Sequence, residues 1–260
     1  MKSHFKYATI SLEVVENRKA QTIAVLIRDS NTDTIIIEEY YANGKRHRRA
    51  ADGPAVIERD PATGVVTVEK YVVEGECHRE PSDGPAVIER DPKTGTVTFE
   101  AYCVNGMIHR HPAVGPAWIE RDLGSGSVTV EEYYSNDDYN RSPVEGPARI
   151  ERDAATGVVT VEEYYTNGHY HRDPVVGPAQ IKRNPATGVI TTERYWLNGK
   201  QHRHPAAGPA VIEREPKSGI TTVAEYWLNG VNLRSPTGDL RSPTRPAIEA
   251  TARPCTPARP

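Results

Sequence analysis

The sequence predicts an all-β protein, an elongated array of antiparallel β-hairpins arranged as a meander or a solenoid-like sheet. Three observations support this fold class. A phrase recurs every 31 residues without insertion. Its segments are short, rich in β-branched and aromatic residues, and bounded by turn signals. No helical period runs through the array. The marker Gly-Pro-Ala begins at residues 53, 84, 115, 146, 177 and 208.

Each repeat contains two candidate strands and two candidate turns. In the first full unit the strands are "AVIERD" (55–60) and "VVTVEKYV" (65–72), joined by "DPATG" (60–64). Pro, Asp, Thr and Gly are typical of such a turn, which would pair Asp60 with Val65 and therefore Ile57 with Val68. The second turn, Asn-Gly at 43–44, would place Tyr40 opposite His47. We expect one continuous meander that grows by one hairpin per unit.

Strict alternation along these strands predicts the two faces of the sheet. One face would be apolar and the other charged. The apolar face would carry Ala55, Ile57, Val66, Val68 and Val72, and the charged face Val56, Glu58, Thr67, Glu69 and Tyr71.

The chain divides into three parts. Residues 1–39 look like a degenerate capping unit, because "AVLIRD" (24–29) stands where "AVIERD" stands later. Residues 40–232 hold the tandem repeats. Residues 233–260 are rich in Pro and Arg, lack a strand pattern, and are expected to be disordered. Terminal units of repeat arrays are often atypical, which fits the first part.

Composition excludes several classes of protein. The net charge is −3, and residues 231–260 carry five Arg against two acidic residues, which leaves −6 for residues 1–230. This acidic body does not favour nucleic-acid binding. The same charge argues against a membrane partner, and the apolar run "TIAVLI" (22–27) is too short to span a bilayer. Three unpaired-looking cysteines favour a reducing, cytoplasmic location. Secretion without a cleaved signal is left open.

No catalytic, metal-binding or cofactor site is predicted. The Glu-Arg-Asp run recurs in nearly every unit, whereas an active site is normally unique. Histidines also recur, but neighbouring units would hold them about 9–10 Å apart, too far to share one ion. We expect them to support the turns. The alternative is a metal on one of the closely spaced pairs, His109/His111, His169/His171 and His202/His204.

Two sets of residues are candidate binding positions. The residue after each repeat tyrosine becomes aromatic toward the C-terminus, which predicts a stripe on the apolar face. The most variable repeat position lies on the charged face, where differences between units could determine which partner binds. The stripe is Tyr134, Tyr165, Trp196 and Trp227, and the variable positions are Trp118, Arg149 and Gln180.

The phrase "YYxNGxxHRxxGPAxI" resembles the variant MORN repeats of bacterial and viral proteins over about residues 38–232. This resemblance implies an elongated β-repeat array that scaffolds or binds other proteins, and in some members associates with membranes. We therefore expect a non-catalytic protein-binding scaffold, with self-association into a homodimer through the apolar face as one mode. The alternatives are a bacterial effector or toxin-associated protein that binds a host protein, and a peripheral membrane-binding module.

Overall fold

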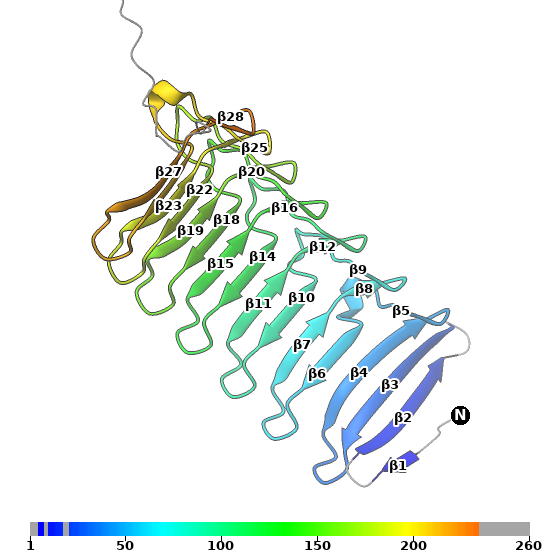
Figure 1. The fold of residues 1–260 in the computed structure, drawn as a ribbon. Helices are drawn as coiled ribbons and strands as arrows, with labels where there is room; N and C mark the ends of the chain where they lie inside the picture. Colours follow the sequence, from blue (N-terminus) through cyan, green and yellow to red (C-terminus); the bar gives the residue numbers. More distant parts are fainter. Residues whose placement is uncertain (1–4, 8–9, 18–20, 234–260) are drawn as a thin grey trace, which may run out of the picture.

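The computed structural model describes residues 5–7, 10–17 and 21–233, and they form an elongated array of antiparallel hairpins (Figure 1). The predicted fold class is confirmed. The disorder predicted for residues 233–260 concerns, apart from Leu233, residues that lie outside the described part. One seventeen-stranded sheet runs the length of the array. Along the ladder its strands are β1 (Phe5–Tyr7), β2 (Ile10–Asn17), β3 (Thr22–Asp29), β4 (Ile35–Ala42), β6 (Val56–Arg59), β7 (Val66–Lys70), β10 (Val87–Arg90), β11 (Val97–Ala101), β14 (Trp118–Arg121), β15 (Val128–Glu132), β18 (Arg149–Arg152), β19 (Val159–Glu163), β22 (Gln180–Arg183), β23 (Ile190–Arg194), β26 (Val211–Arg214) and β27 (Thr221–Glu225), with β5 (Lys45–Arg46) on the end of β4.

A second row of short hairpins lies beside this sheet (Figure 1). Four of its six turns are predicted Asn-Gly turns, at 105–106, 167–168, 198–199 and 229–230, and Asn105 and Gly106 both have positive φ, at 50° and 79°. The other two turn at Glu74-Gly75 and Asn136-Asp137, and the predicted turn at 43–44 joins β4 to β5. The single meander expected from the sequence is therefore wrong in one respect, because each unit adds a sheet hairpin and a separate short hairpin. The short hairpins are β8 (Val72–Val73) with β9 (Glu76–Cys77), β12 (Cys103–Val104) with β13 (Met107–Ile108), β16 (Tyr134–Ser135) with β17 (Asp138–Tyr139), β20 (Tyr165–Thr166) with β21 (His169–Tyr170), β24 (Trp196–Leu197) with β25 (Lys200–Gln201), and β28 (Trp227–Leu228) with β29 (Val231–Asn232).

The repeat tyrosine is the point at which the chain leaves the sheet. The Tyr71 amide donates to the Ala86 carbonyl of the neighbouring strand at 2.8 Å. The Tyr71 carbonyl instead accepts from the amide of His78, across the short hairpin, at 3.0 Å. Tyr40 and His47 make the same contact at 2.8 Å, as the sequence predicted. The repeat tyrosine thus joins the two rows, since its amide bonds to the sheet and its carbonyl to the short hairpin.

The register within each sheet hairpin differs by one residue from the prediction. The predicted pair of Asp60 and Val65 is present, with the Asp60 amide 2.9 Å from the Val65 carbonyl. A β-bulge follows between Glu58 and Arg59, so that Ile57 pairs with Glu69 rather than with Val68. The extra residue is Thr67, whose hydroxyl donates to the Glu58 carbonyl at 3.3 Å. This local bond, repeated in every unit, explains the threonine column.

The bulge changes which residues share a face. We call the side that carries Ile57, Arg59, Glu69 and Tyr71 the repeat face, and the side that carries Val56, Glu58, Val68 and Lys70 the variable face. The predicted apolar and charged faces are therefore wrong, since each true face mixes residues from both.

The repeat face carries ion pairs that cross between units. Arg59 lies 2.6 Å from Glu38, which belongs to the preceding unit. The same pair recurs along the array as Arg90–Glu69, Arg121–Glu100, Arg152–Glu131, Arg183–Glu162 and Arg214–Glu193, at 2.5–2.6 Å. The arginine of the Glu-Arg-Asp run thus has a structural role, because it connects neighbouring units.

The Asp of the same run builds the turn. Asp60 Oδ1 accepts hydrogen bonds from the amides of Ala62 and Thr63 at 3.1 and 2.8 Å. These donors, that of Thr63 first, lower the pKa of Asp60. The same turn, with Asp29 in the place of Asp60, joins β3 to β4.

Arg and Gly-Pro-Ala form a lock behind each short hairpin. The Arg110 guanidinium lies 3.9 Å over the Tyr102 ring and donates to the Pro116 carbonyl at 3.0 Å. Gly115 leaves room for this guanidinium, since a Cβ there would lie 2.9 Å from its Nη1. Ala117 beneath is fully buried. The same lock recurs in the other full units with Arg48, Arg79, Arg141, Arg172 and Arg203.

Two short 3-10 turns complete the described secondary structure, η1 (Ala50–Asp52) and η2 (Pro205–Ala207). Within the described residues, no helix has the length and apolar character needed to cross a membrane.

Candidate functional site

Differences between the repeat units gather on the variable face. Ile, Arg, Glu and Tyr on the repeat face recur almost unchanged from unit to unit, whereas four positions on the variable face change chemistry. In unit order, the first position, in the first strand of each sheet hairpin, holds Val56, Val87, Trp118, Arg149, Gln180 and Val211, and the second, at the end of the second strand, holds Lys70, Ala101, Glu132, Glu163, Arg194 and Glu225. The other two positions face each other in the short hairpins: the third holds Val72, Cys103, Tyr134, Tyr165, Trp196 and Trp227, and the fourth holds Cys77, Ile108, Tyr139, Tyr170, Gln201 and Asn232.

Three of the four residues of the predicted aromatic stripe, Tyr134, Tyr165 and Trp196, belong to a stack of rings in the row of short hairpins. Tyr134 and Tyr139 have ring centroids 4.4 Å apart, and Tyr139 and Tyr165 follow at 4.9 Å. Tyr165 and Tyr170 are 4.2 Å apart, and Tyr170 and Trp196 are 5.4 Å apart. The rings face one another, so their edges rather than their faces point outward. The four contacts among these five rings thus alternate between partners in one hairpin and partners across a unit boundary.

Two members of this stack were missed at the sequence level. Tyr139 and Tyr170 lie directly across the Asn-Gly-type turns from Tyr134 and Tyr165. The signal that could have found them was the pairing of turn-flanking residues, which the sequence already implied for Tyr40 and His47.

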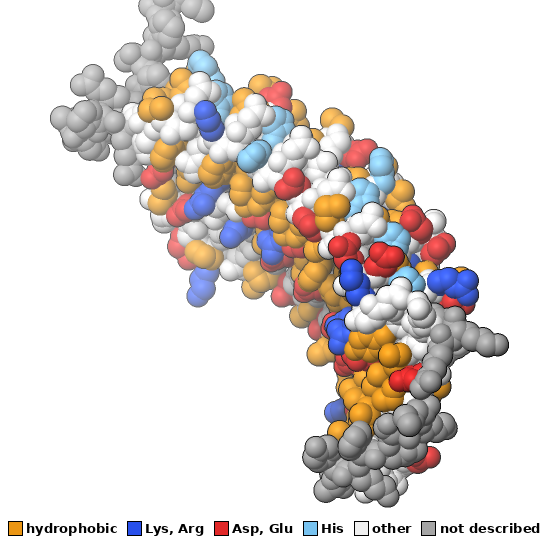
Figure 2. Space-filling model, turned by 90° about the vertical axis from the view of Figure 1, so that its right-hand side faces the viewer, with side chains coloured by type: hydrophobic (Ala, Val, Ile, Leu, Met, Phe, Trp, Pro, Cys, Tyr) orange, Lys and Arg blue, Asp and Glu red, His pale blue; other side chains and the backbone are white. Residues whose placement is uncertain are grey.

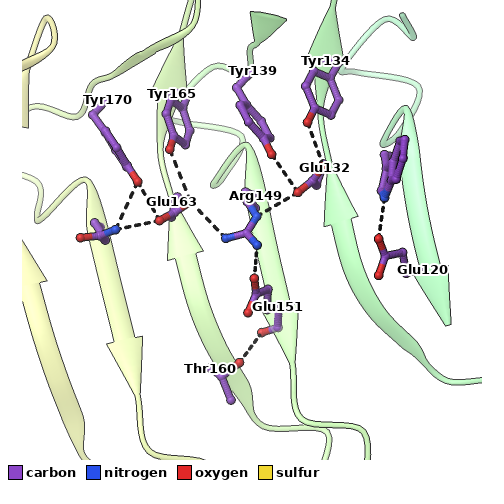
Figure 3. Close-up of polar contacts among 12 residues, drawn as sticks. Glu120, Glu132, Tyr134, Tyr139, Arg149, Glu151, Thr160, Glu163, Tyr165 and Tyr170 are labelled. Carbon is purple, nitrogen blue, oxygen red and sulfur yellow. Dashed lines mark hydrogen bonds and ion pairs between the residues drawn. The ribbon is translucent and has the colours of Figure 1, made fainter. Parts of the chain in front are cut away.

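The stripe and the variable positions lie on one face, whereas the sequence had placed them on opposite faces. Glu132 shows this directly (Figure 3). Its carboxylate accepts from the hydroxyls of Tyr134 and Tyr139 at 2.9 and 2.8 Å, and from Arg149 Nε at 2.9 Å. The side chains come from β15, β16, β17 and β18, so the network joins the sheet to the hairpin row.

Glu163 repeats this arrangement one unit further on (Figure 3). It accepts from the Tyr170 hydroxyl at 2.8 Å, from Gln180 Nε2 at 2.7 Å and, more weakly, from Tyr165 at 3.4 Å. Arg149 connects the two carboxylates, since its Nη1 lies 3.3 Å from Glu163. A third partner of Arg149 is Glu151.

Burial gives these groups shifted pKa values. Desolvation, and then the hydrogen bond to Glu132, raises the pKa of Tyr139 to about 12. Desolvation and the bond to Glu163 raise the pKa of Tyr170 to about 12 as well. Burial alone would lower the pKa of Arg149, but its bond to Glu132 and the charges around it raise that pKa. The network is therefore ionised at its arginine and neutral at its tyrosines near neutral pH.

Trp118 and Trp227 lie outside this network on the same face. Trp118 packs edge-on against Phe99, with centroids 4.4 Å apart, and donates its Nε1 to Glu120 at 2.9 Å. A hollow of about 360 Å³ opens beside these residues. Trp227, in β28 of the final unit, donates its Nε1 to Glu225 at 2.9 Å.

Toward the N-terminus, with the exception of Lys70, the same positions are filled by apolar residues. Cys103 is buried with Ala101, and the partly buried Cys77 and Trp118 pack against the same cluster. The hydrogen bond to Cys77, together with burial, raises the pKa of the Cys103 thiol. The variable face thus changes along its length from apolar to polar and aromatic.

The recurring histidines support the turns, as predicted. His47 Nδ1 accepts from the Glu74 amide of the next unit at 3.1 Å, and His78 accepts from Asn105 at 3.1 Å. Asn140 replaces His in its unit and accepts from Asn167 through its side-chain oxygen at 3.3 Å. The histidines follow one side of the array (Figure 2). In the described part of the chain, no three metal-ligating side chains come together.

Chemically, the site is a polar surface of fixed shape. Its tyrosine hydroxyls, Gln180 and Arg149 all donate to Glu132, Glu151 or Glu163, so neighbouring side chains hold each other in place. Such a surface is suited to recognition. Comparison with known proteins found no matching family model, curated protein or solved structure.

Proposed function

We propose that this chain is a non-catalytic protein-binding scaffold and that the variable face is its binding surface. The observation that carries the proposal is that, among the strand positions of the sheet, the unit-to-unit changes in chemistry gather on one face. A repeat needs identical residues only where they hold the array together, and the repeat face meets that need with its ion pairs and Arg locks. Positions free to differ can be specialised for a partner.

The chemistry of the variable face supports the same function. It presents Trp, Tyr and Arg, the residue types most enriched where proteins bind one another. The internal hydrogen bonds fix these side chains before a partner arrives, which lowers the entropy lost on binding. A cytoplasmic location belongs to the proposal, because three cysteines in 260 residues are too few for a disulfide scaffold.

Site-specific photocrosslinking tests this function. A photoreactive amino acid replaces Lys182, which is exposed on the variable face. The matched control replaces Thr221, which is exposed on the repeat face because it pairs with Arg214. Both proteins are irradiated in the source cells and analysed by mass spectrometry.

We expect polypeptide adducts from position 182 and far fewer from position 221. Adducts between two copies of the chain would identify a homodimer as the assembled form. Equal adducts from the two positions, or none from position 182, would contradict the proposed function.

A further inference from the structure

The two faces of the sheet differ in charge balance. On the repeat face, each of six strand arginines pairs with a glutamate of a neighbouring strand at 2.5–2.6 Å, so the charges of these strand residues cancel. From β4 to β27 the variable face holds nine carboxylates and five cations, a surplus of four negative charges. The carboxylates are Glu39, Glu58, Glu89, Glu120, Glu132, Glu151, Glu163, Glu213 and Glu225, and the cations Arg46, Lys70, Arg149, Lys182 and Arg194.

Five of these carboxylates stand in one accessible row. They occupy the same position in successive units, with Lys182 as the one exception, and apolar residues such as Val68 and Phe99 stand between them. The row is more exposed than the two carboxylates at the centre of the network, since the side chains of Glu151 and Glu213 are 32% and 40% exposed against 7% for Glu163. Glu151 and Glu213 each also pair with one arginine of the same face, Arg149 and Arg194. The row consists of Glu58, Glu89, Glu120, Glu151 and Glu213.

The spacing of this row matches one polypeptide conformation. Adjacent strands lie about 4.7–4.9 Å apart, so equivalent carboxylates of successive units stand about 9–10 Å apart. A polyproline-II helix has about 3 residues per turn and a rise of about 3.1 Å, which places every third side chain on one side at about 9.3 Å. A β-strand does not fit, because its same-side residues repeat at about 6.8 Å.

We propose that the variable face binds an extended, polyproline-II segment of a partner protein that carries Arg or Lys at every third residue. The basic side chains lie on the row of five glutamates and neutralise the surplus charge. The hollow beside Phe99 and Trp118, lined also by Glu89 and Glu120, receives an apolar ring between two basic contacts. This docking mode rests on the proposed function and adds the chemistry of the partner.

Peptide binding to the full chain tests the match. One labelled peptide repeats the triplet Arg-Ser-Pro, and a second has the same composition with its arginines contiguous. Fluorescence anisotropy measures both dissociation constants at physiological salt. We expect the triplet peptide to bind about tenfold more tightly. Equal affinity would mean unspecific attraction and would overturn the proposal, as would the absence of binding.

Charge-matched variants locate the bound peptide. Glu58→Gln with Glu89→Gln removes two carboxylates of the row, whereas Glu74→Gln with Glu145→Gln removes two exposed loop carboxylates. We expect the first pair to weaken triplet-peptide binding about fivefold or more and the second less than about twofold. Equal losses would place the peptide elsewhere and overturn the proposal.

The competing outcomes can be told apart. If a peptide that copies residues 234–260 binds the row more tightly than the triplet peptide, the chain's own tail is the occupant. That result would overturn the proposal of a separate partner protein. If neither the triplet peptide nor the tail peptide binds but position 182 still gives crosslinked partner proteins, the proposed docking mode is wrong and the protein-binding function stands.

Discussion

At the scale of single residues, Arg149 determines how the polar network is held together. It reaches Glu132, Glu151 and Glu163, and two of these carboxylates have side chains only 11% and 7% exposed. Equivalent positions in other units hold Val, Trp or Gln and bring no such cation. Carboxylates this deeply buried require a compensating charge or several donors.

Replacing Arg149 with Met is expected to destabilise the fold by about 2 kcal/mol, because it leaves buried carboxylates without their cation while preserving much of the packing volume. The measurement is the free energy of unfolding in urea. Arg194→Met is the control, since Arg194 is 38% exposed and pairs with a single glutamate at 3.1 Å. Its expected loss is below about 1 kcal/mol. Comparable losses in both variants would show that the network adds nothing to an ordinary ion pair.

At the scale of the element, the lock of Tyr, Arg and Gly-Pro-Ala defines where one unit ends and the next begins. The arginine is held on both sides, by the ring beneath it and by the proline carbonyl. Gly115, with φ of 151°, lies against this guanidinium. An added side chain would meet an atom that has no freedom to move aside.

Gly115→Ala is therefore expected to cost about 2–3 kcal/mol of stability, from backbone strain and from the displaced guanidinium. Gly64→Ala is the matched control: its φ is also positive, at 73°, but no atom lies within 4 Å of the added Cβ. Its expected cost is about 1–2 kcal/mol. Thermal unfolding of both variants gives the comparison, and an equal loss would count against the lock.

Elements and their turns were predictable from sequence, but their register was not. Pro, Gly, Asp and Asn act locally, so the turns at 60–64 and 43–44 formed where expected. The bulge depends on a hydroxyl of Thr67 that bonds a carbonyl across the hairpin, which alternation rules do not include. That single residue moved Val68 to the other face. All seven predicted binding positions nevertheless lie on one face, where the sequence had divided them between two.

At the scale of the whole molecule, every unit is joined to the next by the same bonds. The sheet ladder, the Arg–Glu pairs and the histidine-to-turn bonds each recur at the period of the sequence. A unit can therefore be removed without creating a new kind of contact.

Deleting residues 85–115, one whole period, is expected to leave a folded array shorter by about 9–10 Å. Glu69 would then meet Arg121 in place of Arg90. Small-angle scattering measures the length. Deleting residues 87–116, one residue fewer, places an extra alanine before the strand that begins at Trp118. Each side chain of that strand would then lie on the opposite face of the sheet. This second protein should fold poorly. A well-folded product from both deletions would contradict the register described here.

The course of the sheet also determines how the molecule responds to force. The ladder hydrogen bonds run along the axis of the array, since the strands lie across it (Figure 1). A pull between the two ends of the array therefore opens these bonds one strand at a time rather than shearing many together. Each short hairpin adds a second attachment at every boundary, as in the Gly75 amide bond to Arg46. Under tension the protein would lengthen in steps of one strand, two for each unit, and so act as an extensible link between the structures attached at its two ends.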